Sequence, residues 1–295
     1  MMQNNMPSIL IIGAGPAGIS TAIQLKRYGL TPILLEKDRI GGLLWNANKV
    51  ENYPGFPDGI PGPKLVELFE KQIRRIGIRI IFDEVKNLVF ENDWLVETKQ
   101  AAYRPDVVVI ATGTKPRPLP VTIQDKVKNR VFTEVWRLLE ARKKHIVIVG
   151  AGDAAFDYAL NLTGRGNTVT ILNRSTEVSC LPLLWERASA TPAISYRERS
   201  SLQRIDSDAV TGHLQLFTDG GSLTADYLLF AIGRESQLDF MTKSVKRQER
   251  RLTECGKLYF VGDVHNNLFR QTAIAAGDGL RTAMQIYSQM SLRAT

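Results

Sequence analysis

The sequence predicts an α/β protein with two doubly wound parallel sheets, in which the second domain is inserted into the first. Short runs of Val, Ile and Leu end at glycines and are followed by helical patterns, which is typical of buried parallel strands in this fold class. The same succession of strand, Gly-Ala-Gly turn and helix opens at Gly13 and again at Gly150. A repeat of this kind indicates a duplicated domain.

The first unit begins near the amino end of the chain. An apolar strand over residues 9–12 leads into the turn GAGPAG at 13–18, and a helix is expected over 17–28. In such a GxGxxG turn the first glycine forms the tight bend, the second admits a pyrophosphate, and the third lets helix and strand pack closely. The next strand, 32–35, ends at Glu36, the place for an acid that binds a ribose. These residues predict a Rossmann-like domain that binds a dinucleotide.

The second unit repeats this order with one change at the ribose end. A strand over 146–149 leads into the turn GAGDAA at 150–155 and then a helix. At the position that matches Glu36 stands Asn173, followed by Arg174. A carboxylate there would select NAD, whereas an arginine cluster would select NADP. The sequence therefore leaves both nucleotides open, and also a vestigial unit that binds neither.

Further strands and helices complete the two sheets. Strands that end at glycines are expected at 107–110, 228–232 and 258–261, and helices at 63–76, 154–163 and 272–287. The segment TKPRPLP at 114–120 holds three prolines and predicts a linker, and residues 233–239 predict the return crossing. The predicted boundaries are 1–116 and 237–295 for the first domain and 117–236 for the inserted domain.

Composition and charge exclude several classes of protein. Of the 295 residues, 44% are hydrophobic, which is enough for a core in each domain, and the apolar runs are too short to cross a membrane. The amino end lacks the pattern of a signal peptide, so a cytoplasmic location is expected. A net charge of +8 favours an acidic partner or surface. No nucleic-acid-binding module is present, so nucleic acid is not expected as that partner.

The two cysteines, Cys180 and Cys255, lie far apart in the sequence. They form neither a CxxC pair nor a set of zinc ligands, so no metal site and no local dithiol are predicted. Because a lone cysteine is usually a small buried apolar residue, neither is expected to act in catalysis.

The excess of positive charge has two interpretations, a docking surface or an ordinary solvated loop. It gathers at Lys243, Lys246, Arg247, Arg250, Arg251, Arg197, Arg199 and Arg204.

These motifs together give the chain a resemblance to the low-molecular-weight thioredoxin reductases, a family of two-domain flavoproteins. The resemblance rests on the two glycine turns and on several further motifs in family order, namely GGL at 41–43, VENYPGF at 50–56, ATG at 111–113, AIG at 231–233, GD at 262–263 and RQ at 270–271. It covers nearly the whole chain. It implies FAD in the first domain, a nicotinamide nucleotide in the second, and a homodimer.

The resemblance also implies which residues bind the cofactors. Those for FAD would be Gly13, Gly15, Pro16, Ala17, Gly18, Glu36, Lys37, Gly41, Gly42, Leu43, Asn52, Ala111, Thr112, Gly113, Gly262, Asp263, Arg270, Gln271, Thr272 and Ala273. Those for the nicotinamide nucleotide would be Gly150, Gly152, Asp153, Ala154, Ala155, Asn173, Arg174, Ile232 and Gly233. No side chain is assigned as catalytic, because hydride transfer to a flavin is chemistry of the cofactors.

Two departures from the family pattern shape the functional prediction. The family's CxxC dithiol would fall near Thr133-Glu134-Val135-Trp136, which contains no thiol, and its HRR-type phosphate clamp is represented by Asn173-Arg174-Ser175. Disulfide exchange requires a thiolate. We therefore expect an FAD-dependent NAD(P)H oxidoreductase that passes electrons to a separate, acidic redox protein without a dithiol.

Three alternatives stay open. The first is a ferredoxin- or flavodoxin-NAD(P) reductase, or an electron donor to an iron-sulphur enzyme of the radical type. The second, from another class, is a redox-sensing binding protein in which FAD is structural. The third is a reductase of small molecules. Trp136 is expected to be an ordinary core residue, with stacking on the flavin as the alternative.

Overall fold

The computed structural model describes residues 7–208 and 212–294, and it is an α/β structure with two parallel sheets. The fold class expected from the sequence is confirmed. The chain divides into two compact units. Unit 1 holds the described residues up to Trp45, then Glu51–Lys115, and the chain from Glu235 onward. Unit 2 holds Asn46–Val50 and Pro116–Arg234.

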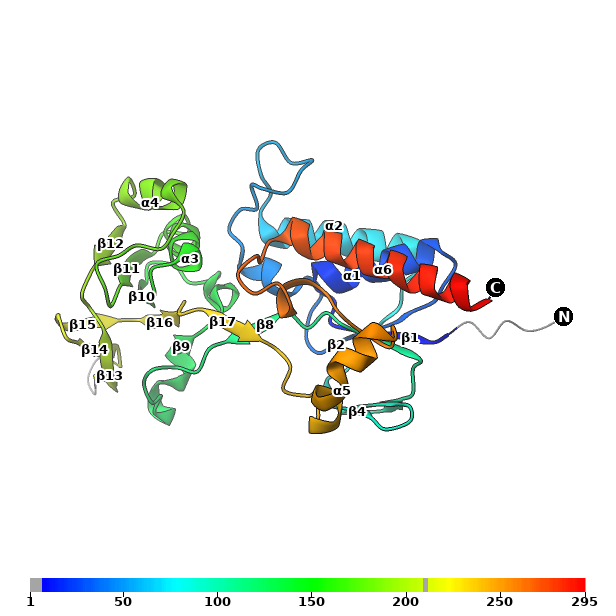
Figure 1. Cartoon of the computed structure of the whole chain (residues 1–295). Coiled ribbons are helices and arrows are strands. Elements are labelled where there is room, and N and C mark those ends of the chain that lie inside the picture. The colour runs from blue at the N-terminus through cyan, green and yellow to red at the C-terminus, as the bar shows by residue number, and fades with distance from the viewer. Residues whose placement is uncertain (1–6, 209–211, 295) are drawn as a thin grey trace. The chain divides into compact units, whose positions relative to one another are not determined.

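Unit 1 is built on a five-stranded parallel sheet in the order β18-β7-β1-β2-β3, of which Figure 1 labels β1 and β2. Its strands are β1 (Ile9–Ile12), β2 (Ile33–Glu36), β3 (Ile80–Phe82), β7 (Val107–Ile110) and β18 (Leu258–Phe260). All four pairings are parallel. The four residues of the central strand β1 are all buried, because both faces of the sheet are covered by other elements of the unit.

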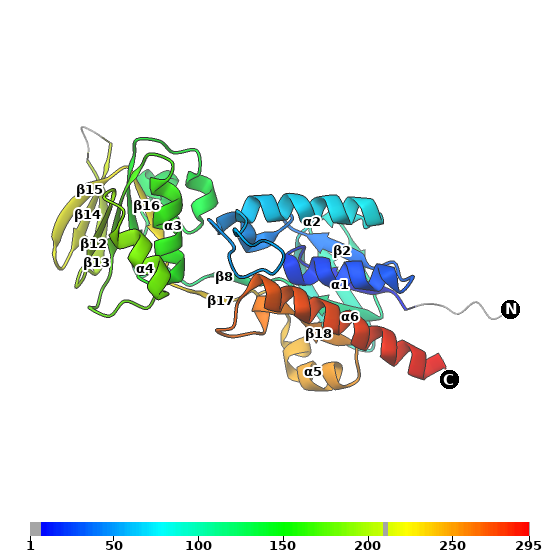
Figure 2. The ribbon, with the colours of Figure 1, turned by 90° about the horizontal axis from the view of Figure 1, so that it is seen from above.

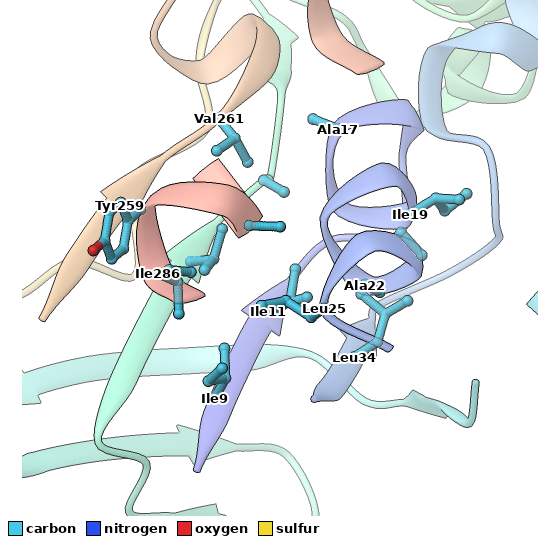
Figure 3. Packing of buried hydrophobic residues seen from close by; sticks show 14 of the residues in the cluster. Ile9, Ile11, Ala17, Ile19, Ala22, Leu25, Leu34, Tyr259, Val261 and Ile286 are labelled. Atoms are coloured by element: carbon cyan, nitrogen blue, oxygen red, sulfur yellow. The ribbon is translucent and has the colours of Figure 1, made fainter. Parts of the chain in front are cut away.

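Three helices cover one face of this sheet, and Figure 2 shows them side by side. They are α1 (Pro16–Arg27), α2 (Gly62–Ile76) and α6 (Thr272–Ala294). Because side chains alternate along a strand, Ile9 and Ile11 of β1 point to this face and pack among the residues labelled in Figure 3. Helix α6 approaches α1 closely at Gly279, where a side chain would collide with the backbone oxygen of Ala17.

The opposite face of the sheet carries a second core. It lies beneath α5 (Lys243–Glu254) and an antiparallel sheet made of β4 (Val85–Phe90), β5 (Trp94–Thr98) and β6 (Ala102–Tyr103). Leu10 and Ile12 of β1 point here, and the helix contributes Val245 and Leu252. The cation-rich segment after residue 242 is thus an amphipathic helix rather than a loop, since its two apolar residues are seven positions apart on one face.

Unit 2 repeats the design with a parallel sheet in the order β12-β11-β10-β16-β9. The strands are β9 (Val131–Phe132), β10 (His145–Val149), β11 (Thr168–Leu172), β12 (Ile194–Arg197) and β16 (Tyr227–Phe230). Helices α3 (Asp153–Thr163) and α4 (Pro182–Ser189) cover one face. An antiparallel sheet covers the other, made of β13 (Leu202–Ser207), β14 (Leu214–Thr218) and β15 (Gly221–Ala225).

The chain crosses between the units at 45/46, 50/51, 115/116 and 234/235. The segments of the last two crossings pair with each other as short strands, β8 (Thr114–Pro116) and β17 (Arg234–Ser236). Four 3-10 helices complete the described elements: η1 (Gly42–Asn46), η2 (Asp125–Arg130), η3 (Val135–Leu138) and η4 (Gly262–Val264). Over residues 7–208 and 212–294, none of the helices combines the length and the apolar character that crossing a bilayer requires.

Two candidate dinucleotide sites

The first glycine turn joins β1 to α1. Gly13 donates its N–H to the Leu35 oxygen at 2.8 Å, and its backbone has a φ of +105°, a region that favours glycine. A side chain there would stand 2.5 Å from the Ala111 oxygen. At Gly18 a side chain would collide with the Gly13 oxygen. The first and third glycines are therefore required by the packing of the turn itself.

The second glycine of this turn has a different environment. A Cβ at Gly15 would have no atom within 4 Å, so the turn is open on this side. Gly15 is the N-cap of α1, with no side-chain hydrogen bond to the cap and no acidic residue in the first turn of the helix. Free backbone N–H groups and the positive end of the helix dipole attract anions. The turn is thus suited to a pyrophosphate.

Two more sequence-predicted positions meet this turn. Glu36, at the end of β2, accepts hydrogen bonds from the Ala14 N–H at 2.8 Å and from the Asp38 N–H at 3.0 Å. Gly41 donates to the Ala14 oxygen at 2.8 Å, and a Cβ on Gly42 would stand 3.6 Å from the Gly15 Cα. The structure therefore places Glu36 and the pair Gly41-Gly42 against the first glycine turn. Lys37 is exposed, and Leu43 lies half-buried in η1.

The remaining predicted residues of unit 1 fall in two groups. Ala111 lies against the first turn, whereas Thr112 donates its hydroxyl to the Gln237 oxygen at 2.7 Å and Gly113 accepts from the Gln237 N–H at 3.0 Å. Gly262 packs on Ala17 at the start of α1.

The other group surrounds the start of α6. Asn52 donates its amide N–H to the Gln271 side-chain oxygen at 2.9 Å, although 219 residues separate them. Asp263 and Arg270 are both half-buried, in η4 and just before α6. Thr272 and Ala273 open that helix. Polar side chains from two distant parts of the sequence, residue 52 and residues 263–272, thus belong to this unit, and Asn52 and Gln271 are in direct contact.

The second glycine turn reproduces the first in unit 2. Gly150 donates to the Leu172 oxygen at 3.0 Å and has a φ of +128°, and a side chain would collide with the Ala231 oxygen. A Cβ on Gly152 would meet only the Ser179 hydroxyl, at 3.7 Å. Ala155, fully buried, takes the place of the third glycine.

The start of α3 differs from the start of α1, because its first residue is the acidic Asp153. It accepts a hydrogen bond from the Leu181 N–H at 2.7 Å and so ties down the loop before α4. Ala154 beside it is exposed. Ile232 and Gly233 follow β16, the strand beside β10. Ile232 is half-buried, and the Gly233 carbonyl oxygen accepts from the Arg117 N–H at 3.2 Å. These predicted residues of unit 2 thus lie at the carboxyl ends of β10 and β16, and Asn173 and Arg174 follow β11.

The ribose end of this turn is built differently from that of the first. Asn173 is 6% exposed and donates its amide to the Glu177 oxygen and to the Tyr196 hydroxyl, both at 2.8 Å. Its own side-chain oxygen accepts from the Ser175 N–H at 3.2 Å. The side chain thus holds the loop after β11. Arg174, next to it, is exposed.

The segment 133–136, where the family resemblance would place a dithiol, contains one partner of an ion pair. The Glu134 carboxylate accepts from Arg234 at 2.9 Å and also from the Asn46 amide, and the two charged side chains are only about one-fifth exposed. Trp136 is half-buried; its N–H donates to the Asn46 oxygen at 3.3 Å, and the Arg137 guanidinium lies over its ring. Sequence reasoning missed this pair, since its partners are 100 residues apart.

The two cysteines belong to different units. Cys180 is half-buried in unit 2, and burial, with the Asp153 carboxylate nearby, raises the pKa of its thiol. A raised pKa leaves less thiolate at neutral pH, which disfavours nucleophilic attack. Cys255 is exposed at the end of α5 in unit 1. Among the residues described, no cluster of His, Cys, Asp and Glu could hold a metal ion.

Comparison with known proteins agrees with this geometry. The family model for pyridine nucleotide-disulphide oxidoreductases matches residues 7–279. A thioredoxin reductase from Streptomyces clavuligerus is 29% identical over 302 residues, which cover 96% of this chain and 93% of the relative. The crystal structure of the thioredoxin reductase from T. acidophilum aligns with a TM-score of 0.84 and 26% identity, over 96% of this chain and 98% of that one.

A third similarity concerns the fold alone. The bacillithiol disulfide reductase from Staphylococcus aureus aligns with a TM-score of 0.74 at 20% identity, over 96% of this chain and 98% of that one. Thioredoxin reductases of this family use FAD and NADPH. The chain therefore belongs to the pyridine nucleotide-disulphide oxidoreductase family, as an oxidoreductase of the thioredoxin reductase type that uses FAD and a nicotinamide nucleotide.

Proposed function

We propose that the protein passes electrons from a nicotinamide nucleotide through FAD to a separate redox protein, by a route that uses no pair of cysteines. One observation carries this proposal. The segment at 133–136, where relatives of this type would have their dithiol, contains Glu134 in an ion pair with Arg234. Exchange with a disulfide needs a thiolate, and residues 133–136 include no cysteine.

The FAD site proposed in unit 1 follows from the contacts of the first turn. Gly15 would admit the pyrophosphate and the start of α1 would stabilise its charge. Glu36 uses one lone pair of each carboxylate oxygen within the protein and keeps others for the ribose hydroxyls of the adenosine. We assign the flavin end to Asn52, Asp263, Arg270 and Gln271, because their polar atoms belong to the same unit and two of them are already joined.

Unit 2 would bind the nicotinamide nucleotide at its own turn, with Gly152 as the point of closest approach. When bound, the flavin accepts a hydride and releases electrons to an acceptor. The residues of the chain bind and orient the two cofactors, and Arg270 would stabilise negative charge on the reduced ring. No acid or base side chain is required for these steps, so no catalytic residue is assigned.

For the acceptor we propose an acidic redox protein, of the ferredoxin or iron-sulphur kind. Helix α5 supports this choice, because Lys243, Lys246 and Arg247 are all exposed on it. The net charge of +8 also favours an acidic acceptor. Charge complementarity of this kind raises the rate at which two proteins meet.

We also propose a homodimer and a cytoplasmic location, as for the thioredoxin reductases that the chain resembles.

The test is a cysteine-free variant, Cys180→Ser with Cys255→Ser. We expect this variant, loaded with FAD, to oxidise NADPH with ferredoxin or flavodoxin as acceptor at the wild-type rate, because neither thiol takes part. Neither protein should reduce thioredoxin above the background rate. A drop of more than about tenfold in the variant would show that a thiol carries electrons and would contradict the proposal.

A further inference from the structure

Two of the four points at which the chain crosses between the units delimit a short segment, residues 46–50, which we call the strap. The strap belongs to unit 2 by its contacts, although Trp45 before it and Glu51 after it both belong to unit 1. The other two crossings lie at 115/116 and 234/235. Because both ends of the strap continue into unit 1, a movement of one unit against the other has to strain the strap or release it.

Hydrogen bonds from both asparagines of the strap hold it in unit 2. Asn46 is 4% exposed; its amide donates to the Glu134 carboxylate, and its side-chain oxygen accepts from the Trp136 N–H at 3.3 Å. The Asn48 N–H donates to the Asp157 carboxylate at 2.9 Å. A buried amide that loses its hydrogen-bond partners costs free energy, so Asn46 resists detachment of the strap.

Glu134 also holds the return crossing at 234/235. Its second carboxylate oxygen accepts from the Arg234 guanidinium at 2.9 Å, and Arg234 is the last residue of unit 2 before the chain returns to unit 1. The two side chains of this ion pair are 20% and 19% exposed, so solvent and salt screen it only in part. One carboxylate thus fixes both the first residue of the strap and the last residue before the return crossing.

The ion pairs on the unit 1 side of the same crossings are more exposed. Lys115, the last residue of unit 1 before the crossing at 115/116, contacts Asp239 at 2.6 Å and Glu235 at 3.4 Å. The side chains of these two acids are 64% and 45% exposed, and exposed ion pairs contribute little to stability. Lys115 lies on β8 and Glu235 on β17, so these pairs give a matched control within the same two strands.

We infer that Glu134 is a junction that keeps the strap and the return crossing fixed to unit 2 together, so that unit 2 moves against unit 1 only when this carboxylate releases both. Glu134 is a positioning residue, which acts through Asn46 and Arg234 and takes no part in hydride transfer. The inference goes beyond the proposed function and does not depend on it, because it concerns only the connections between the units.

The test measures the distance between two spin labels by pulsed electron paramagnetic resonance on the FAD-loaded protein, with no nucleotide or acceptor added. One label is attached to Cys255, which is exposed in unit 1, and the other to Glu186→Cys on α4 of unit 2, in a protein that carries Cys180→Ser. We expect one narrow distance distribution while Glu134 is present, and a broader distribution or a second distance in Glu134→Ala. A distribution in Glu134→Ala as narrow as in the protein that keeps Glu134 would overturn the inference, and so would a broad distribution in the latter.

Further variants separate this role from a general loss of stability. Asn46→Ala removes the contact with the strap but leaves the ion pair of Glu134 in place, and it should broaden the distribution even if Glu134→Ala fails to fold. Lys115→Ala breaks the exposed ion pairs beside the same crossings, and Ile148→Val lowers the stability of unit 2 through a change in its core. Both controls should keep the narrow distribution. Broadening in either control as large as in Asn46→Ala would overturn the inference.

Discussion

Replacement of Gly15 by valine is expected to give a folded protein that has lost its flavin. The backbone of Gly15 has a φ of −78° and a ψ of −179°, which valine adopts without strain, and a Cβ there meets no atom within 4 Å. The apoprotein should therefore lose no more than about 1 kcal/mol of stability, since valine is a poorer N-cap residue than glycine. The same Cβ would stand where the pyrophosphate approaches the backbone, so FAD affinity should fall by at least about 100-fold.

The matched control is Gly13→Ala in the same turn. Its Cβ would stand 2.5 Å from the Ala111 oxygen on a backbone with a φ of +105°, so this variant should lose about 2 kcal/mol or more of stability even without flavin. Titration of FAD into each apoprotein, with thermal unfolding alongside, separates the two effects. If the folded Gly15→Val protein binds FAD as tightly as the wild type does, the pyrophosphate does not lie at this turn.

Replacement of Glu134 by alanine is expected to destabilise unit 2 by about 2 kcal/mol, because it removes a largely buried acceptor from Arg234 and from Asn46. The segment 46–50 should also loosen, since the Asn46 oxygen holds the Trp136 N–H and the Asn48 N–H donates to Asp157 at 2.9 Å. Hydrogen exchange at residues 46–50 and chemical unfolding measure the two effects. Glu134→Ala combined with Asn46→Ala should cost less than the sum of the single changes.

The Glu134 carboxylate also affects its surroundings. Tyr158 is almost fully buried near it, and burial together with this negative charge raises the pKa of the phenol. The phenol therefore stays neutral at physiological pH, and loss of Glu134 introduces no new charge at Tyr158. Unchanged stability and unchanged exchange in Glu134→Ala would mean that the ion pair does not hold this part of unit 2 together.

The parallel sheets and the two glycine turns could be predicted from sequence because both signals are local. The run of apolar residues before Gly13 marks a strand buried on both faces, and the spacing of the glycines follows from collisions within the turn. Four predicted helices, at 17–28, 63–76, 154–163 and 272–287, correspond to α1, α2, α3 and α6. For the same reason the places of Gly18, Glu36 and Ala155 beside the two turns can be predicted from their spacing.

Other features depend on contacts between distant segments and had no local signal. The amide of Asn173 is engaged by Tyr196, 23 residues later, so a polar residue at the ribose position says nothing alone about the ligand. The two antiparallel sheets, β4–β6 and β13–β15, follow no glycine motif. Helix α5 has a strongly polar sequence in which only Val245 and Leu252 are buried. Two apolar residues are too few to give a clear helical periodicity in the sequence.

The most direct test of the account is an anaerobic titration of the FAD-loaded protein with NADPH, followed by the flavin absorbance. We predict that about one equivalent of NADPH bleaches the flavin completely, in the wild type and in the variant with Cys180→Ser and Cys255→Ser alike. The same titration is carried out with NADH as the donor. A flavin that stays oxidised with both nucleotides would contradict electron entry through unit 2, and with it the proposed function.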